Sequence, residues 1–70
     1  MSQVRVTLQD VADDDNRHLV NMPTVPRNGD YIVIEDQAYT VTSINYHVQP
    51  PNRRDYVGNC TKITVWMGKR

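Results

Sequence analysis

RNGDYIVIEDQAYTVTSINYHV, residues 27–48, is the stretch of this sequence that decides the fold. A turn signal, Asn28-Gly29-Asp30, precedes the run Tyr31–Ile34, which is rich in β-branched residues. A short polar break, Glu35–Gln37, then leads into a longer run, Ala38–Val48. Two such runs joined by a tight connection predict an antiparallel hairpin. The sequence therefore predicts a small all-β domain.

The longer run does not keep its apolar residues in one phase. These residues are Tyr39, Val41, Ile44, Tyr46 and Val48. By strict alternation the first two face one side of a strand and the last three face the other. A slip of one residue near Thr42-Ser43 brings all five to the same side. We therefore predict a β-bulge or sharp bend there, of the kind that curved barrels use to close.

Working outward from this hairpin, the remaining strands are expected at Val4–Leu8, His18–Met22 and Cys60–Met67. The polar segment Asp10–His18 is expected to be a solvated loop. The segment Gln49–Asn59 contains Pro50-Pro51 and is expected to be a stiff loop. The prediction is a single domain, residues 1–70, built as a small SH3-like barrel of about five antiparallel strands.

Length and composition limit the class of protein. Seventy residues allow one domain with a modest core. The single cysteine, Cys60, excludes an internal disulfide, which is typical of a reducing compartment. No apolar stretch approaches the roughly 20 residues of a membrane span, and the N-terminal residues lack the pattern of a secretory signal. We therefore expect a cytoplasmic protein, in the host cytoplasm if a phage encodes it.

The formal net charge of zero hides an asymmetry between the two halves of the chain. Residues 1–36 carry three basic and seven acidic side chains, whereas residues 37–70 carry five basic and one acidic. The balanced total argues against strong non-specific attraction to nucleic acid, because that attraction scales with the number of phosphates neutralised. The polarity favours self-association or a partner of mixed charge.

The middle third of the chain also carries a family resemblance. The pattern Pro26-Arg27-x-Gly29-Asp30-Tyr31-Ile32, followed by Tyr39-x-Val41-x-x-Ile44-x-Tyr46-His47, resembles short uncharacterised phage and bacterial proteins with an SH3-like barrel. The resemblance implies a compact barrel of about five strands, often encoded in phage or mobile-element genomes. It is specific for the strand-turn-strand architecture and weak for activity.

The side chains with chemical potential do not form a catalytic or metal-binding pattern. Counted from Asp13, the glycine and glutamate positions of a calcium loop hold His18 and Thr24, so no calcium site is predicted. The residues His18, His47 and Cys60 lack the paired spacing of a zinc site. No acid or glycine-rich oxyanion loop accompanies Cys60 and His47. We therefore predict no enzyme, no metal and no cofactor.

The sequence instead offers candidate residues for binding a partner. Arginine makes forked bonds to carboxylates and phosphates, and tyrosine offers a large contact area at low entropic cost. Trp66 falls on the less apolar face of the last strand, where it is expected to be core or a subunit interface. The candidate partner-binding residues are His47, Arg53, Arg54, Tyr56, Asp13, Asp14, Asp15 and Trp66.

Three functions follow as hypotheses. The first is a protein-binding module of a phage or mobile element, which binds or inhibits a host protein through its loops. The second is a small barrel that binds single-stranded nucleic acid, with bases stacked on Tyr46, Tyr56 and Trp66 beside Arg53, Arg54 and Lys62. The third is a homo-oligomeric structural or virion component, for which an unpaired sheet edge and a small core are the physical grounds.

Overall fold

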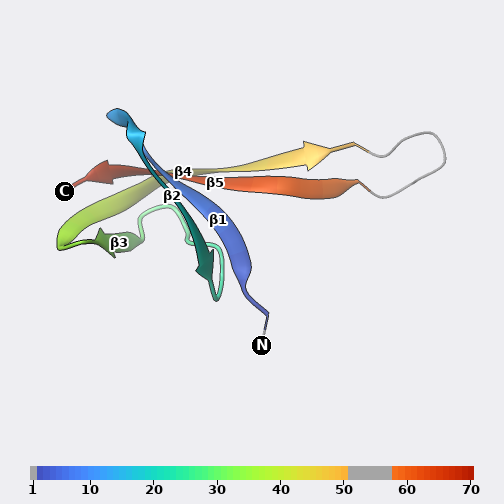
Figure 1. The fold of residues 1–70 in the computed structure, drawn as a ribbon, viewed down its shortest axis with the longest axis horizontal. Coiled ribbons are helices and arrows are strands. Elements are labelled where there is room, and N and C mark those ends of the chain that lie inside the picture. Colours follow the sequence, from blue (N-terminus) through green and yellow to red (C-terminus); the bar gives the residue numbers. More distant parts are fainter. Residues whose placement is uncertain (1, 51–57) are drawn as a thin grey trace.

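Five β-strands make up the computed structural model, which describes residues 2–50 and 58–70 (Figure 1). They are β1 (Val4–Asp10), β2 (Asp13–Met22), β3 (Tyr31–Ile34), β4 (Gln37–Gln49) and β5 (Asn59–Lys69). The described residues contain no helix. The predicted all-β class and number of strands are therefore confirmed.

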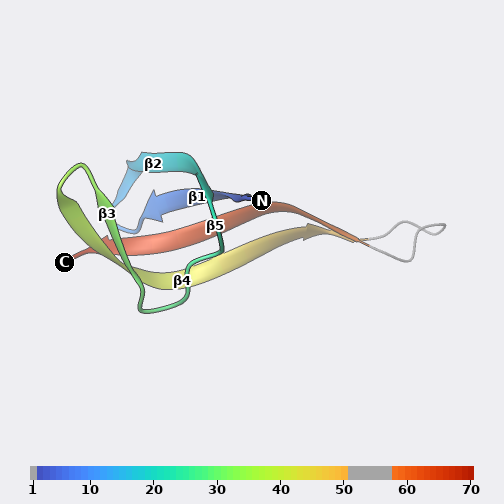
Figure 2. The ribbon, with the colours of Figure 1, turned by 90° about the horizontal axis from the view of Figure 1, so that it is seen from below.

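The strands form one sheet in the order β2-β1-β5-β4-β3. This sheet curls into a half-barrel (Figures 1 and 2). Three of its pairings are antiparallel, as predicted, but β1 and β5 run parallel to each other. The expectation of antiparallel pairing throughout thus fails at one position. β2 pairs with one side of β1, and β5 pairs with the other side in the same direction as β1.

The predicted bulge in β4 is confirmed. Val41 lies opposite Met67, but the next pair joins Ser43 to Trp66, so Thr42 is the extra residue. Its hydroxyl donates a hydrogen bond of 3.3 Å to the Trp66 carbonyl oxygen. The bulge bends the strand and keeps the apolar residues on both sides of it on one face of the sheet.

The turn between β3 and β4 is a two-residue connection, with Ile34 paired to Gln37. Glu35 and Asp36 both have positive φ, at 48° and 69°. Two positive φ values match the right-handed twist of a tight hairpin, although asparagine and glycine adopt them at lower cost than glutamate and aspartate. The polar break predicted here is therefore a strained turn.

The segment Asp10–His18 is where the loop expectation was wrong. Only Val11-Ala12 forms the turn, and a ten-residue strand begins at Asp13. The Asp10 carboxylate accepts a hydrogen bond of 2.9 Å from the Ala12 amide, which closes the turn. A polar sequence forms a strand here because β2 lies at the sheet edge, with β1 on one side only. The strand predicted at His18–Met22 is the second half of β2.

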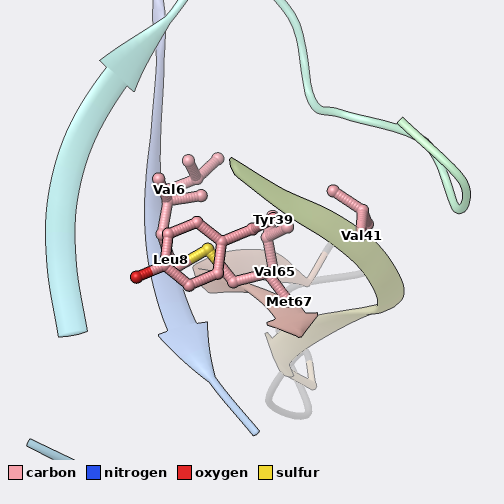
Figure 3. Close-up of a cluster of buried hydrophobic side chains, with 6 residues drawn as sticks. All are labelled: Val6, Leu8, Tyr39, Val41, Val65 and Met67. Carbon is pink, nitrogen blue, oxygen red and sulfur yellow. The ribbon is translucent and has the colours of Figure 1, made fainter. Parts of the chain in front are cut away.

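The core is a cluster of buried side chains from strands β1, β4 and β5 (Figure 3). Strands β1, β4 and β5 each contribute two side chains, two residues apart, and each of these is at most 4 % exposed. They are Val6, Leu8, Tyr39, Val41, Val65 and Met67. The core is small, as expected for a chain of this length.

Candidate interaction surface

The distal part of the β4–β5 hairpin is the most distinctive feature of the molecule. β1 pairs with β5 only along Thr64–Met67, and β3 pairs with β4 only along Gln37–Thr40. Beyond those pairings, β4 and β5 pair with no described strand other than each other. We call residues 44–49 and 59–63 the arm, which projects from the curled sheet (Figures 1 and 2).

One face of the arm is apolar. Ile44 lies opposite Val65, which is fully buried in the core. Residues directly opposite each other in an antiparallel pair share a face, so the core face of the sheet continues onto the arm. The residues on this face, which we call the arm stripe, are Ile44, Tyr46, Val48, Cys60 and Ile63.

The side chains of the arm stripe become more exposed with distance from the core. Ile44 and Ile63 are half-buried, whereas Tyr46 is 58 % exposed and Val48 is 60 % exposed. A second irregularity, at His47 and Val48, shifts the register so that Val48 lies opposite Cys60. Two bulges thus hold the stripe on one side along its whole length. No other described strand covers its outer half.

The opposite face of the β4–β5 hairpin is polar and internally bonded. On the arm it carries Asn45, His47 and Lys62, and Thr64 follows next to the arm. The His47 Nε2 lies 3.2 Å from the Thr64 hydroxyl, and the Thr61 hydroxyl donates to the His47 carbonyl at 3.1 Å. Two predicted site residues, His47 and Trp66, lie on this face. Trp66 is half-buried beside Ser43 and Gln9, and it is not part of the core cluster.

The acidic residues Asp13, Asp14 and Asp15 lie at the start of β2, and all three are exposed. The Gln9 side-chain amide bonds the Asp13 and Asp14 carbonyls at 3.1 and 3.4 Å, which fixes the backbone of this segment. The β1–β2 turn lies at the opposite end of the molecule from the arm tip (Figure 1). The structure therefore does not bring the acidic residues together with His47.

Three further predicted residues, Arg53, Arg54 and Tyr56, lie outside the described residues, as does most of the predicted loop Gln49–Asn59. Their contribution to a partner site stays a prediction from the sequence.

A polar network that the sequence did not reveal closes one end of the core. The Asn16 side-chain amide donates to Asp10 Oδ2 at 3.0 Å and to the Tyr39 hydroxyl at 2.9 Å. Its carbonyl oxygen lies 2.8 Å from the His18 Nε2. Because the Asn16 oxygen can only accept, the His18 Nε2 carries the proton. The network ties β1 and β2 to β4, and its members lie too far apart in the sequence to be recognised as one group.

Asp10 is the anchor of this network and is 1 % exposed. The hydrogen bonds from the Ala12 amide and the Asn16 side chain lower the pKa of the Asp10 carboxyl, and the nearby Lys69 acts in the same direction. Burial opposes them but does not outweigh them. Asp10 is therefore a charged, fully bonded structural residue.

An open hollow of about 370 Å³ lies between the end of β2 and the start of β3. Its walls are mostly apolar, and Asp30 is the one charged residue on them. The Asp30 carboxylate is already bonded to the Arg27 amide at 2.8 Å. The lining residues are Met22, Pro23, Thr24, Pro26, Asp30, Tyr31 and Ile32.

The side chains with reactive or metal-binding groups in the described part of the chain do not form an assembled site. Cys60 is exposed on the arm, and its thiol contacts the Lys62 carbonyl at 3.6 Å. Residues 2–50 and 58–70 contain no cluster of three or more histidine, cysteine, aspartate or glutamate side chains suited to a metal ion. Nor does any helix in those ranges have the length and hydropathy to cross a membrane.

Comparison of the chain with protein-family profiles, with curated proteins and with solved structures gave no match.

Proposed function

We propose that this chain is a non-enzymatic protein-binding module, and that the arm stripe is its principal contact surface. The observation that carries the proposal is a projecting two-stranded arm with one apolar and one polar face. Apolar side chains on the outer half of the stripe meet no other described strand.

The energetics of the arm favour a partner. A two-stranded ribbon without further packing is only marginally stable in water. Full burial of a valine or aromatic side chain contributes about 1.5–3 kcal/mol. Since Tyr46 and Val48 are more than half exposed, covering them would contribute about 2–3 kcal/mol in total. Tyrosine is also among the residues that most often dominate protein interfaces.

The arrangement gives less support to binding of single-stranded nucleic acid. Tyr46 lies on the arm stripe, whereas Lys62 and Trp66 lie on the opposite face. Stacking of successive bases requires aromatic and basic side chains along one groove. Inhibition of a host protein and origin in a phage remain predictions from the sequence.

The proposal is tested with two matched double variants. Tyr46→Glu with Val48→Glu places two charges on the arm stripe. Asn45→Glu with Gln49→Glu places the same charges, on the same strand, on the opposite face, where both side chains are exposed. Circular dichroism first verifies that both variants are folded.

Each protein is then immobilised, and bound proteins from the encoding organism are quantified by mass spectrometry. We expect the wild type and the opposite-face variant to retain the same partner, and the stripe variant to lose it at least tenfold. Sedimentation velocity on the same proteins shows whether that partner is a second copy of the chain. Equal retention by both variants would contradict the proposal.

A further inference from the structure

The outer edge of β2 is a free sheet edge of unusual length. At ten residues, β2 is about twice the average strand. It pairs with β1 on one side only. Within residues 2–50 and 58–70, no backbone hydrogen bond outside the strand ladders involves β2. Its outward N–H and C=O groups along Arg17–Met22 therefore meet no other backbone in the described structure.

Along Arg17–Met22 this edge has little of the protection that natural sheets give to their edges. Charged side chains, lysine above all, together with proline, bulges and short length, are the common devices, and Arg17 is the one charged residue of this stretch. From Arg17 to Met22, β2 pairs with β1 without irregularity and contains neither proline nor lysine. Leu19, in the middle of this stretch, is 66 % exposed. The edge is thus regular, accessible and partly apolar.

The two ends of the edge differ in chemistry. At the beginning of β2, Asp13, Asp14 and Asp15 are all exposed. At its end, Met22 and Pro23 form one wall of the 370 Å³ hollow. An acidic segment, a free strand edge and an apolar hollow therefore follow one another along a single strand.

We infer that the β2 edge binds an extended segment of a partner protein as an added antiparallel strand. Backbone hydrogen bonds to Arg17–Met22 provide affinity, and side chains at the two ends provide specificity. An apolar side chain of the segment enters the hollow beside Met22, and basic side chains lie opposite Asp14 and Asp15. This surface is separate from the arm stripe, so the inference does not rest on the proposed function.

The geometry fixes the order of the ligand residues. In an antiparallel ladder the partner residue opposite Met22 precedes the residue opposite Asp15 by about seven positions, or about 24 Å. The preferred ligand is therefore an extended segment whose apolar residue is followed, about seven positions later, by lysine or arginine. Acidic segments are excluded by repulsion from the three aspartates.

The first test uses a displayed library of random twelve-residue peptides. Enrichment of peptides with an apolar residue about seven positions before a basic pair supports the inference. Enrichment of acidic peptides, or no enrichment, overturns it. The best peptide is then labelled with a fluorophore, and its affinity is measured by anisotropy.

Three changes separate strand addition from general charge attraction. Methylation of alternate backbone nitrogens in the middle of the peptide should weaken binding at least tenfold, because it removes ladder donors. Asp14→Asn with Asp15→Asn should weaken it about three- to tenfold and reduce its salt dependence. The control, Glu35→Gln with Asp36→Asn, removes two charges at the β3–β4 turn, on the other edge of the sheet, and should not change the affinity.

Two further readouts place the site. In ¹⁵N-labelled protein, the peptide should shift the amide signals of Arg17–Met22 more than those of the arm. The variant Tyr46→Glu with Val48→Glu should bind the peptide as the wild type does, which distinguishes failure of this inference from failure of the proposed function. If the wild type dimerised and Leu19→Lys abolished the dimer, a second copy of the chain would occupy the edge, and the inference would be overturned.

Discussion

Replacing valine with alanine at a core position and at an arm position tests whether the arm is packed, because the loss of unfolding free energy depends on burial. Val65 is fully buried in the central strand β5, whereas Val48 is 60 % exposed on the arm stripe. Both lie on the core face of the β4–β5 hairpin. Val65→Ala and Val48→Ala therefore differ in burial but share the chemistry and the loss of β-propensity.

The expected magnitudes follow from burial. Removing two methyl groups at Val65 costs about 1.6 kcal/mol of transfer free energy, and the remaining cavity adds about 1 kcal/mol. At Val48 only about 40 % of the side chain is buried, so the transfer cost falls to about 0.6 kcal/mol, without a cavity. The free energies of unfolding of the two variants should differ by about 2 kcal/mol.

The assay is urea unfolding at low micromolar concentration, followed by far-ultraviolet circular dichroism. With an m-value of about 1 kcal/mol/M, the two midpoints should lie about 2 M apart. Equal loss of stability in both variants would refute the assignment of Val48 to an open surface. If the two variants lost equal stability at high protein concentration but not after dilution, a second copy of the chain would be covering the arm.

Three further predictions concern the turn, the bulge and the polar network. Glu35→Asn with Asp36→Gly should raise the free energy of unfolding by about 1 kcal/mol, because both positions have positive φ; an unchanged urea midpoint would contradict this. Deletion of Thr42 should preserve a cooperative unfolding transition, since it leaves Ser43 opposite Trp66 and Ile44 opposite Val65. Deletion of Asn45 should be more damaging, because it moves Tyr46 and Val48 to the polar face; the two unfolding curves decide the order. Finally, the lowered pKa of Asp10 means that its stabilising contribution is complete above the ordinary value of 3.8 and is lost as pH falls through the lower folded-state pKa. Asp10→Asn should therefore be less stable than the wild type at pH 6 and should lose less stability on acidification, as measured by urea midpoints between pH 2 and 6.

Local pattern was sufficient to predict most of the strands. The alternation in Tyr31–Ile34 and Ala38–Val48 identified the β3–β4 hairpin, and the phase slip identified the bulge at Thr42. The pattern failed at Asp13–Asn16, because an edge strand has one side in water and tolerates charged residues. The three aspartates were expected to lie in a loop because the segment is polar throughout, and this composition does not distinguish a loop from an edge strand.

The candidate surface was less accessible to sequence reasoning. His47 and Trp66 were expected to contact a partner, and both lie on the polar side of the sheet, whereas the exposed apolar stripe lies on the other side. Three residues of that stripe, Ile44, Tyr46 and Val48, were expected to share the inward face of a curved barrel strand. Their apolar character was clear from the sequence, but their exposure depends on where β1 and β3 stop pairing.

By itself, the sequence determined the all-β class, the positions of most strands, the bulge and the absence of an internal disulfide. These properties depend on alternation, turn residues and cysteine number, which are local or can be counted. The tertiary structure alone decided that β1 and β5 run parallel, that the sheet stays open at β2, and that the arm extends past its neighbours. Those features depend on which distant segments pair and over what length, and the alternation within a strand does not specify its partner.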